Sequence, residues 1–161
     1  DLNDAASIAA MLKRVGKVDA IASTAGHVPF NTLDALSRDD FIHGFTDKAL
    51  GQIELAQRGM DYLNDGGSIT LMSGVLARTP IKTGAVASMV NGALESYVRA
   101  AAIETQRGIR INAVSPTVLV EATGFHPYFP GFPQVTLKQV TDAYVRAVDG
   151  WDTGTVYMLD S

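Results

Sequence analysis

Residues Ser68–Val90 read SITLMSGVLARTPIKTGAVASMV, and the interpretation of the rest of the chain starts from them. The stretch predicts a buried strand over Ser68–Ser73, then a loop, then the first turns of a helix. Ser73 therefore stands at the carboxyl end of a strand. Ligands of open α/β sheets bind outside the carboxyl ends of the strands, so we expect chemistry around Ser73.

Segments typical of helices and strands alternate on both sides of this stretch. Further strands are predicted over residues 18–23, 110–115 and 153–159. Helices are predicted over residues 4–15, 37–63, 85–106 and 136–150, with Asp4, Ser37 and Thr136 as capping residues and a break at Asn64–Gly67. Alternation of this kind predicts an α/β fold, a doubly wound parallel sheet of Rossmann type with helices on both faces.

Composition narrows the classes of partner. The net charge is −4 and no basic run is present, which argues against nucleic acid and anionic membrane surfaces. The absence of cysteine excludes a disulfide framework and a thiolate metal site. No apolar run approaches the ~20 residues of a membrane span. We therefore expect a cytoplasmic protein with a single domain over residues 1–161.

Five short motifs, in the right order and spacing, resemble the short-chain dehydrogenase/reductase family. They are Asp1-Leu2, Ser23-Thr24-Ala25-Gly26, Ser73, Asn112-Ala113-Val114-Ser115-Pro116-Thr117 and Thr153-Gly154-Thr155-Val156. The resemblance implies an oxidoreductase that uses NAD or NADP and acts on the carbonyl or alcohol group of a small molecule. It also implies a homodimer or homotetramer, and the run Ala100-Ala101-Ala102 is small enough for close helix approach.

The same resemblance assigns residues to the cofactor and to catalysis. The implied dinucleotide-binding residues are Asp1, Leu2, Thr24, Ala25, Gly26, Ser73, Pro116, Thr117 and Leu119. Ser73 takes the position of the family's catalytic serine. The residue that separates NAD from NADP would precede Asp1.

Two features of the family are not found in this sequence. The Gly-rich phosphate turn should precede Asp1 by a strand and a helix, and the chain begins at Asp1 without a methionine. We therefore expect this sequence to be the C-terminal four-fifths of a longer chain. The alternative is a late start, which would leave the strand at residues 18–23 as a sheet edge.

The second missing feature is chemical. The family's proton-donating tyrosine and the lysine four residues later align with Val86 and Val90. Valine can neither donate a proton nor hold a ribose hydroxyl. General acid–base catalysis is worth ~10²–10⁴ in rate, so another group must substitute if the protein is an enzyme.

Lys48 is the candidate for this substitution. The resemblance places it where the family carries its catalytic asparagine, three residues before Gly51. Its helical neighbours at i±3 and i±4 include no carboxylate, and Phe41 and Leu55 continue that face. An inward lysine needs an anionic partner or a lowered pKa. The alternative is a side chain that extends to solvent over apolar neighbours.

Three other polar residues have a functional and a structural interpretation. Ser73 could donate a hydrogen bond to a substrate oxygen, or it could cap the strand end. His27 follows a glycine turn and could exchange protons, or it could be an exposed loop residue. Asn91, next to the position aligned with the family's lysine, could act in catalysis, but an interface or helix-packing amide is the favoured interpretation.

The segment His126–Pro133, HPYFPGFP, lies where the family carries its substrate loop. Tyr128, Phe129 and Phe132 are expected to line an apolar pocket or to pack on a neighbouring subunit. The three histidines show no ligand spacing, so no metal site is predicted.

Three hypotheses remain open from the sequence. The first is an oxidoreductase in which Ser73 and Lys48 polarise a carbonyl. The second is a non-catalytic nucleotide-binding protein of the same fold. The third is an assembly protein whose long helices serve only oligomer contacts.

Overall fold

The structure is a computed structural model and describes residues 1–160. Its four strands form one parallel sheet in the order β1-β2-β3-β4. The strands are β1 Val18–Ala22, β2 Leu63–Met72, β3 Arg110–Pro116 and β4 Val156–Leu159. The parallel α/β sheet predicted from the alternation of elements is confirmed.

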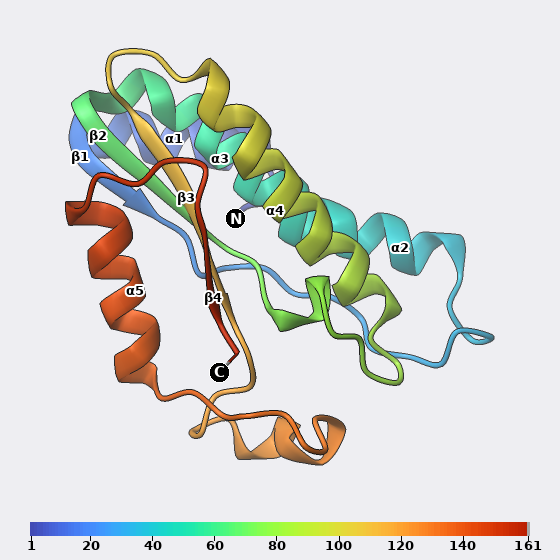
Figure 1. Ribbon diagram of the computed structural model, residues 1–161. Coiled ribbons are helices and arrows are strands. Elements are labelled where there is room, and N and C mark those ends of the chain that lie inside the picture. The colour runs from blue at the N-terminus through green and yellow to red at the C-terminus, as the bar shows by residue number, and fades with distance from the viewer. Residues whose placement is uncertain (161) are drawn as a thin grey trace.

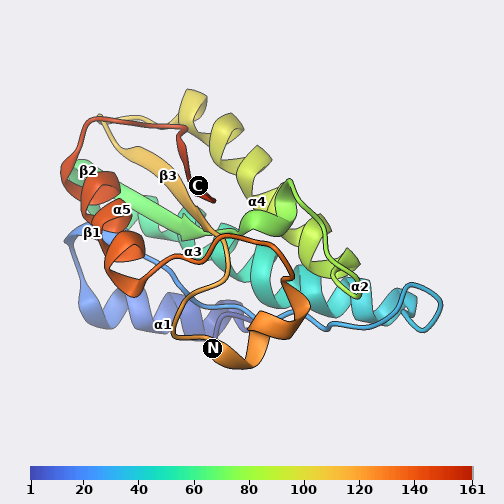
Figure 2. The ribbon, with the colours of Figure 1, turned by 60° about the horizontal axis from the view of Figure 1, so that its bottom comes forward.

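Helices lie on both faces of this sheet. They are α1 Ala5–Val15, α2 Arg38–Gly44, α3 Gly51–Gly59, α4 Ala85–Glu104 and α5 Leu137–Asp149. Figure 1 shows α3 and α4 on one face and α5 on the other. Figure 2 shows α1 beside α3, near the edge strand β1, where Ile8 and Leu12 pack with Leu55. The predicted capping residues Asp4, Ser37 and Thr136 all accept hydrogen bonds from their helices.

Two apolar cores hold the layers together. The larger lies between the sheet and the helices α3 and α4, and a smaller one lies under α5. On α4, the larger core includes a stripe at i, i+4 spacing: Val86, Val90, Leu94 and Val98, each 0% exposed. Burial of such side chains contributes about 1.5–3 kcal/mol each, so this stripe fixes the rotation of α4 about its axis.

The first long helix predicted from the sequence is helical throughout residues 38–62, but it is not a regular α-helix along its whole length. A π-helical segment, η1, spans Phe45–Leu50 between α2 and α3, and a short 3₁₀ turn, η2, spans Met60–Tyr62. Single-turn π segments inside helices are frequent at functional sites, and Lys48 lies in this one.

The predicted break at Asn64–Gly67 is wrong, because β2 already begins at Leu63. Val18 pairs with Leu63 but Ala20 pairs with Ser68, so the residues between form an irregular bulge. Gly66 has φ +77° there, a backbone conformation that side chains other than glycine rarely adopt. Arg107 donates to the Leu63 carbonyl and the Asp65 carboxylate, so these two acceptors of the bulge have hydrogen-bond partners.

The connections at the carboxyl ends of the strands carry two 3₁₀ turns, η3 at Val75–Ala77 and η4 at Thr123–Tyr128. The second overlaps the aromatic segment His126–Pro133, and β4 begins three residues later than predicted. Over residues 1–160, no helix combines the length and apolar character needed to cross a bilayer.

Candidate active site

A pocket of about 330 Å³ lies beyond the carboxyl ends of three neighbouring strands. The loop after β1 contributes Gly26 and His27, the end of β2 contributes Ser73, and the end of β3 contributes Pro116 and Thr117. Apolar residues make up most of the remaining wall: Val28, Phe30, Val75, Leu76, Ala87, Val118, Leu119, Ala122, Phe125 and Phe129. This is where ligands of parallel α/β sheets bind.

Lys48 reaches this pocket from η1, as the sequence predicted for an inward lysine. Its Nζ donates to the Ser73 carbonyl over 3.4 Å, a long bond, and over residues 1–160 it forms no ion pair within 4.0 Å. Desolvation lowers the pKa of Lys48 from 10.5 to about 8. The amino group of Lys48 is thus held at the pocket, and the long bond to the Ser73 carbonyl leaves its other N–H donors for a ligand.

Gln52 fixes the position of Lys48 relative to the end of β2. Its side chain is fully buried, accepts a bond from Met72 N at 2.9 Å and donates to Met72 O at 3.0 Å. It also donates to the Lys48 carbonyl at 3.2 Å. The helix backbone at Lys48 is therefore tied directly to the strand that carries Ser73.

Gly26 packs against Lys48 from the other side. A Cβ atom at Gly26 would lie 2.7 Å from Lys48 Cγ and 2.8 Å from Lys48 Cα, and its φ is +126°. Only glycine allows both the close approach and this backbone conformation. The small-residue turn predicted after the first strand therefore serves to seat Lys48.

Ser73 is part of a buried charge network that the sequence did not reveal. Its hydroxyl donates to Glu95 Oε1 at 2.9 Å, and the Ser115 hydroxyl donates to the same oxygen at 2.7 Å. Arg78 donates from Nη1 to Glu95 and pairs through Nη2 with Asp160 at 2.8 Å. Because Ser73 gives its proton to a carboxylate, its oxygen faces other groups as an acceptor.

The residues of α4 that line the pocket are not the two valines that the sequence analysis aligned with the family's tyrosine and lysine. Val86 and Val90, the aligned positions of the family's tyrosine and lysine, are fully buried in the core. The residues that line the pocket at four-residue spacing are Ala87 and Asn91. The valines belong to the apolar stripe that holds α4 against the sheet, so Ala87 and Asn91 are the α4 side chains that face a ligand.

Asn91 is a functional candidate for which the sequence interpretation favoured a packing role. It is 3% exposed, and its Oδ1 has no hydrogen-bond partner. Thr117 Oγ1, also on the pocket wall, has none either. Leaving a buried polar atom unsatisfied costs about 1–3 kcal/mol. Two such atoms in the pocket that Lys48 lines suit a binding site in which the ligand supplies their hydrogen-bond partners.

The residues assigned to a dinucleotide fall into two groups. Gly26, Ser73, Pro116, Thr117 and Leu119 line the pocket, and the exposed Thr24 and Ala25 immediately precede Gly26. Asp1 and Leu2 do not line it: the amino group of Asp1 donates to Ser7 Oγ at 2.8 Å, and Leu2 packs against Gly51. The structure therefore brings five of the nine assigned residues together at one pocket.

The aromatic segment contributes less than expected. Phe129 lines the pocket together with Phe125, which the sequence analysis did not select. Phe132 packs edge-to-face on Phe129, with ring centroids 5.3 Å apart, and so supports the wall from behind. Tyr128 is 56% exposed and lies outside this pocket.

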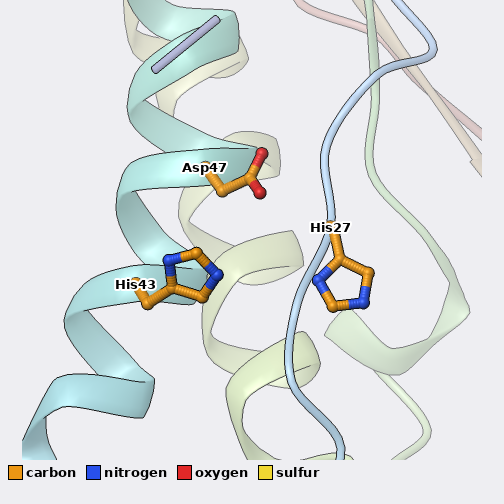
Figure 3. A group of neighbouring side chains, drawn as sticks. All are labelled: His27, His43 and Asp47. Carbon is orange, nitrogen blue, oxygen red and sulfur yellow. The ribbon is translucent and has the colours of Figure 1, made fainter.

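The histidines are less scattered in space than in sequence. His27, His43 and Asp47 come together beside the pocket, with potential ligand atoms all within 4.8 Å of one another (Figure 3). The sequence analysis did not group them because His27 lies on a different element from the other two.

Comparisons with known proteins match this chain to reductases and dehydrogenases. A family model described as enoyl-(acyl carrier protein) reductase matches residues 1–150. A short-chain dehydrogenase/reductase of Pestalotiopsis microspora is 32% identical over 134 residues, covering 80% of this chain and 50% of the relative. Versicolorin reductase 1 of Dothistroma septosporum is 30% identical over 136 residues, covering 81% and 52%. The chain spans about half the length of the curated relatives it matches.

Two solved structures are similar over nearly the whole chain. The protein lin1944 of Listeria innocua is 43% identical with a TM-score of 0.96, covering 98% of this chain and 80% of that one. A small-chain dehydrogenase crystallised in complex with NADPH is 27% identical with a TM-score of 0.89, covering 99% and 80%.

Proposed function

Because the chain belongs to the short-chain dehydrogenase/reductase family, we propose that the intact protein is an NAD(P)-dependent oxidoreductase of a small carbonyl or alcohol compound. The observation that carries the proposal is the convergence on one pocket of Lys48 Nζ, which has a single long hydrogen bond, and of two unpartnered oxygens, Asn91 Oδ1 and Thr117 Oγ1. NADPH in a similar structure supports the choice of cofactor class.

The pocket residues fit the nicotinamide end of such a cofactor. Gly26 leaves its backbone open to close approach, and Asn91 Oδ1 and Thr117 Oγ1 need hydrogen-bond partners. Sugar hydroxyls and a carboxamide offer donors of that kind. When bound, the cofactor would supply or accept the hydride.

In this proposal Lys48 meets the charge that develops on the substrate oxygen. A carbonyl that accepts hydride gains negative charge, which must be met by preorganised donors. Lys48 Nζ carries N–H donors in either protonation state, so the proposal requires only its position. Ser73 helps through its carbonyl, which orients Nζ, and through the network that fixes the end of β2.

One observation favours a second function. Ala87 supplies no hydroxyl at the wall position that faces the pocket, and the Ser73 hydroxyl donates its hydrogen bond to Glu95. A protein with this site could bind a dinucleotide without turning over a substrate. This non-catalytic alternative shares the binding site and differs only in its chemistry.

The test is turnover by the intact protein with NADH or NADPH and a broad panel of carbonyl compounds. We expect Lys48→Met to lower kcat by ~10²-fold while dinucleotide affinity stays within a few-fold. Lys138→Met, at an exposed position on α5, is the matched control and should keep full rate. Full rate in Lys48→Met would exclude the catalytic role of Lys48. No turnover by wild type with any compound, together with dinucleotide binding, would support the non-catalytic alternative.

The proposal includes a homodimer or homotetramer of the intact protein. The exposed Ala100 and the half-buried Ala101 line a groove between α3 and α4 with Tyr97 and Met60. Small residues of this kind allow close approach of a second copy. Light scattering that gives a monomer mass at micromolar concentration would exclude this part of the proposal.

A further inference from the structure

Three side chains with metal-ligating atoms converge outside the set of groups assigned to the carbonyl chemistry. His43 and Asp47 are four residues apart, on α2 and at the start of η1, and therefore lie on one side of the helix. His27 comes from the loop after β1. Figure 3 shows the His27 and His43 rings and the Asp47 carboxylate gathered between that loop and the helix.

Their spacing is close to that of a coordination sphere. The three ligand atoms lie within 4.8 Å of one another. A point therefore exists within about 2.8 Å of all three (4.8 Å divided by the square root of three), against about 2.0–2.2 Å for zinc bound to histidine and carboxylate. Closing this gap takes less than about 1 Å per ligand, which side-chain rotation supplies because both histidines are exposed.

Nothing in the described chain competes for these groups. Over residues 1–160, neither imidazole donates or accepts a hydrogen bond, and Asp47 forms no ion pair within 4.0 Å. The other histidine, His126, bonds to the Leu119 carbonyl at 2.9 Å and is engaged in its own turn. The three converging groups are thus available to a ligand, whereas His126 is not.

The donor set selects a class of cation. Two imidazole nitrogens and one carboxylate suit zinc and related divalent transition metals, and three protein ligands leave a further position open. Calcium and magnesium prefer all-oxygen sites, for which a single carboxylate is insufficient. We propose that His27, His43 and Asp47 bind a divalent transition-metal cation that ties the loop after β1 to the helix beside the pocket.

The site has a structural consequence for the pocket. Residues 23–36 form no helix or strand, yet Gly26, His27, Val28 and Phe30 from this loop line the pocket. A metal that joins His27 to His43 closes the loop between them and restricts it in the folded state. Metal occupancy therefore stabilises one wall of the pocket.

The experiment is calorimetric titration of the intact, chelator-treated protein with zinc chloride. We expect one zinc per chain, with affinity lowered more than about 100-fold in His43→Ala and about 10-fold or more in Asp47→Asn. His126→Ala is the matched control and should bind as wild type does. Circular dichroism of each variant checks that it folds. If His43→Ala does not fold, His27→Asn tests the same site from the loop side.

A second measurement separates this site from adventitious binding. Cobalt(II) bound by three protein ligands gives visible absorption bands, which should appear in wild type and His126→Ala and disappear in His43→Ala. Absence of zinc binding by wild type would overturn the proposal. Equal binding by wild type and the three ligand variants would overturn it as well, because the cation would then lie elsewhere.

Discussion

Two charged side chains flank Ser73, the buried Glu95 and the half-buried Lys48, and their hydrogen bonding differs. Glu95 is 4% exposed, and its Oε1 accepts from Ser73, Ser115 and Arg78 at 2.7–2.9 Å. Lys48 on the other side has one long bond, to a backbone carbonyl at 3.4 Å. Burial of a charge is costly unless the charge is paired. A charge with full hydrogen bonding therefore indicates a structural role, and a charge without it indicates a ligand-binding role.

The same contrast recurs between two buried asparagines. Asn112 is 0% exposed, donates to the Asp152 carbonyl at 2.7 Å and accepts from Thr155 N at 3.0 Å. Asn91, at 3% exposure, has an Oδ1 without a partner. Asn112 ties β3 to the turn before β4, whereas Asn91 lines the pocket. The partnered asparagine therefore belongs to the scaffold, and the one with an unpartnered oxygen lies at the site.

Removal of the satisfied charge should have the largest effect on stability. Glu95→Leu leaves Arg78 and two hydroxyls without their acceptor, and we expect a loss of about 3–5 kcal/mol in unfolding free energy. Urea denaturation of the intact protein measures it. The control is Glu104→Leu, an exposed position on the same helix, with a change within about 0.5 kcal/mol. Equal losses of stability in Glu95→Leu and the control would show that the Glu95 network does not stabilise the fold.

Substitutions of the two asparagines test the same comparison. Asn112→Leu should lose about 2–3 kcal/mol, because two hydrogen bonds are broken and their partners stay buried. Asn91→Leu should leave the stability of the free protein unchanged or slightly higher, and weaken dinucleotide binding about ten-fold. Denaturation and fluorescence titration give the two quantities. A stability loss in Asn91→Leu as large as that in Asn112→Leu would make Asn91 a structural residue.

Gly26→Ala disturbs the seat of Lys48 without changing its chemistry. The added methyl group would meet Lys48 Cγ at 2.7 Å on a backbone with φ +126°. We expect a loss of about 2 kcal/mol in stability, and lower turnover wherever wild type has any. Gly124→Ala, which has no atom within 4 Å of its Cβ position, should change stability by less than about 0.5 kcal/mol. Stability equal to wild type in Gly26→Ala would show that the loop yields and does not hold Lys48.

Much of the fold and part of the site follow from local sequence. Capping motifs at Asp4, Ser37 and Thr136 predicted three helix starts, because such caps act within one turn. The inward direction of Lys48 followed from its apolar helical neighbours. Its approach to Ser73 follows from the carboxyl-end rule of parallel sheets.

What the sequence did not reveal depends on contacts between distant segments or on small rotations. Glu95 precedes Arg99 by four residues, a spacing that predicts an ion pair along the helix, but it turns inward to Arg78, and Arg99 lies farther away at 3.6 Å. A shift of one residue rotates a helix position by about 100°, which separates Val86 from Ala87. The apolar stripe Val86, Val90, Leu94 and Val98 was the signal that could have assigned the valines to the core. No comparable local signal joins His27 to His43.

The unfolding free energy of Lys48→Met, measured by urea denaturation without ligand, tests the central claim most directly. If Lys48 is held at the pocket for a ligand, methionine removes a buried charge without breaking a strong contact. Stability should then stay equal to wild type or rise by up to about 2 kcal/mol. A loss approaching that of Glu95→Leu would contradict the account, because Lys48 would then be a structural charge like Glu95.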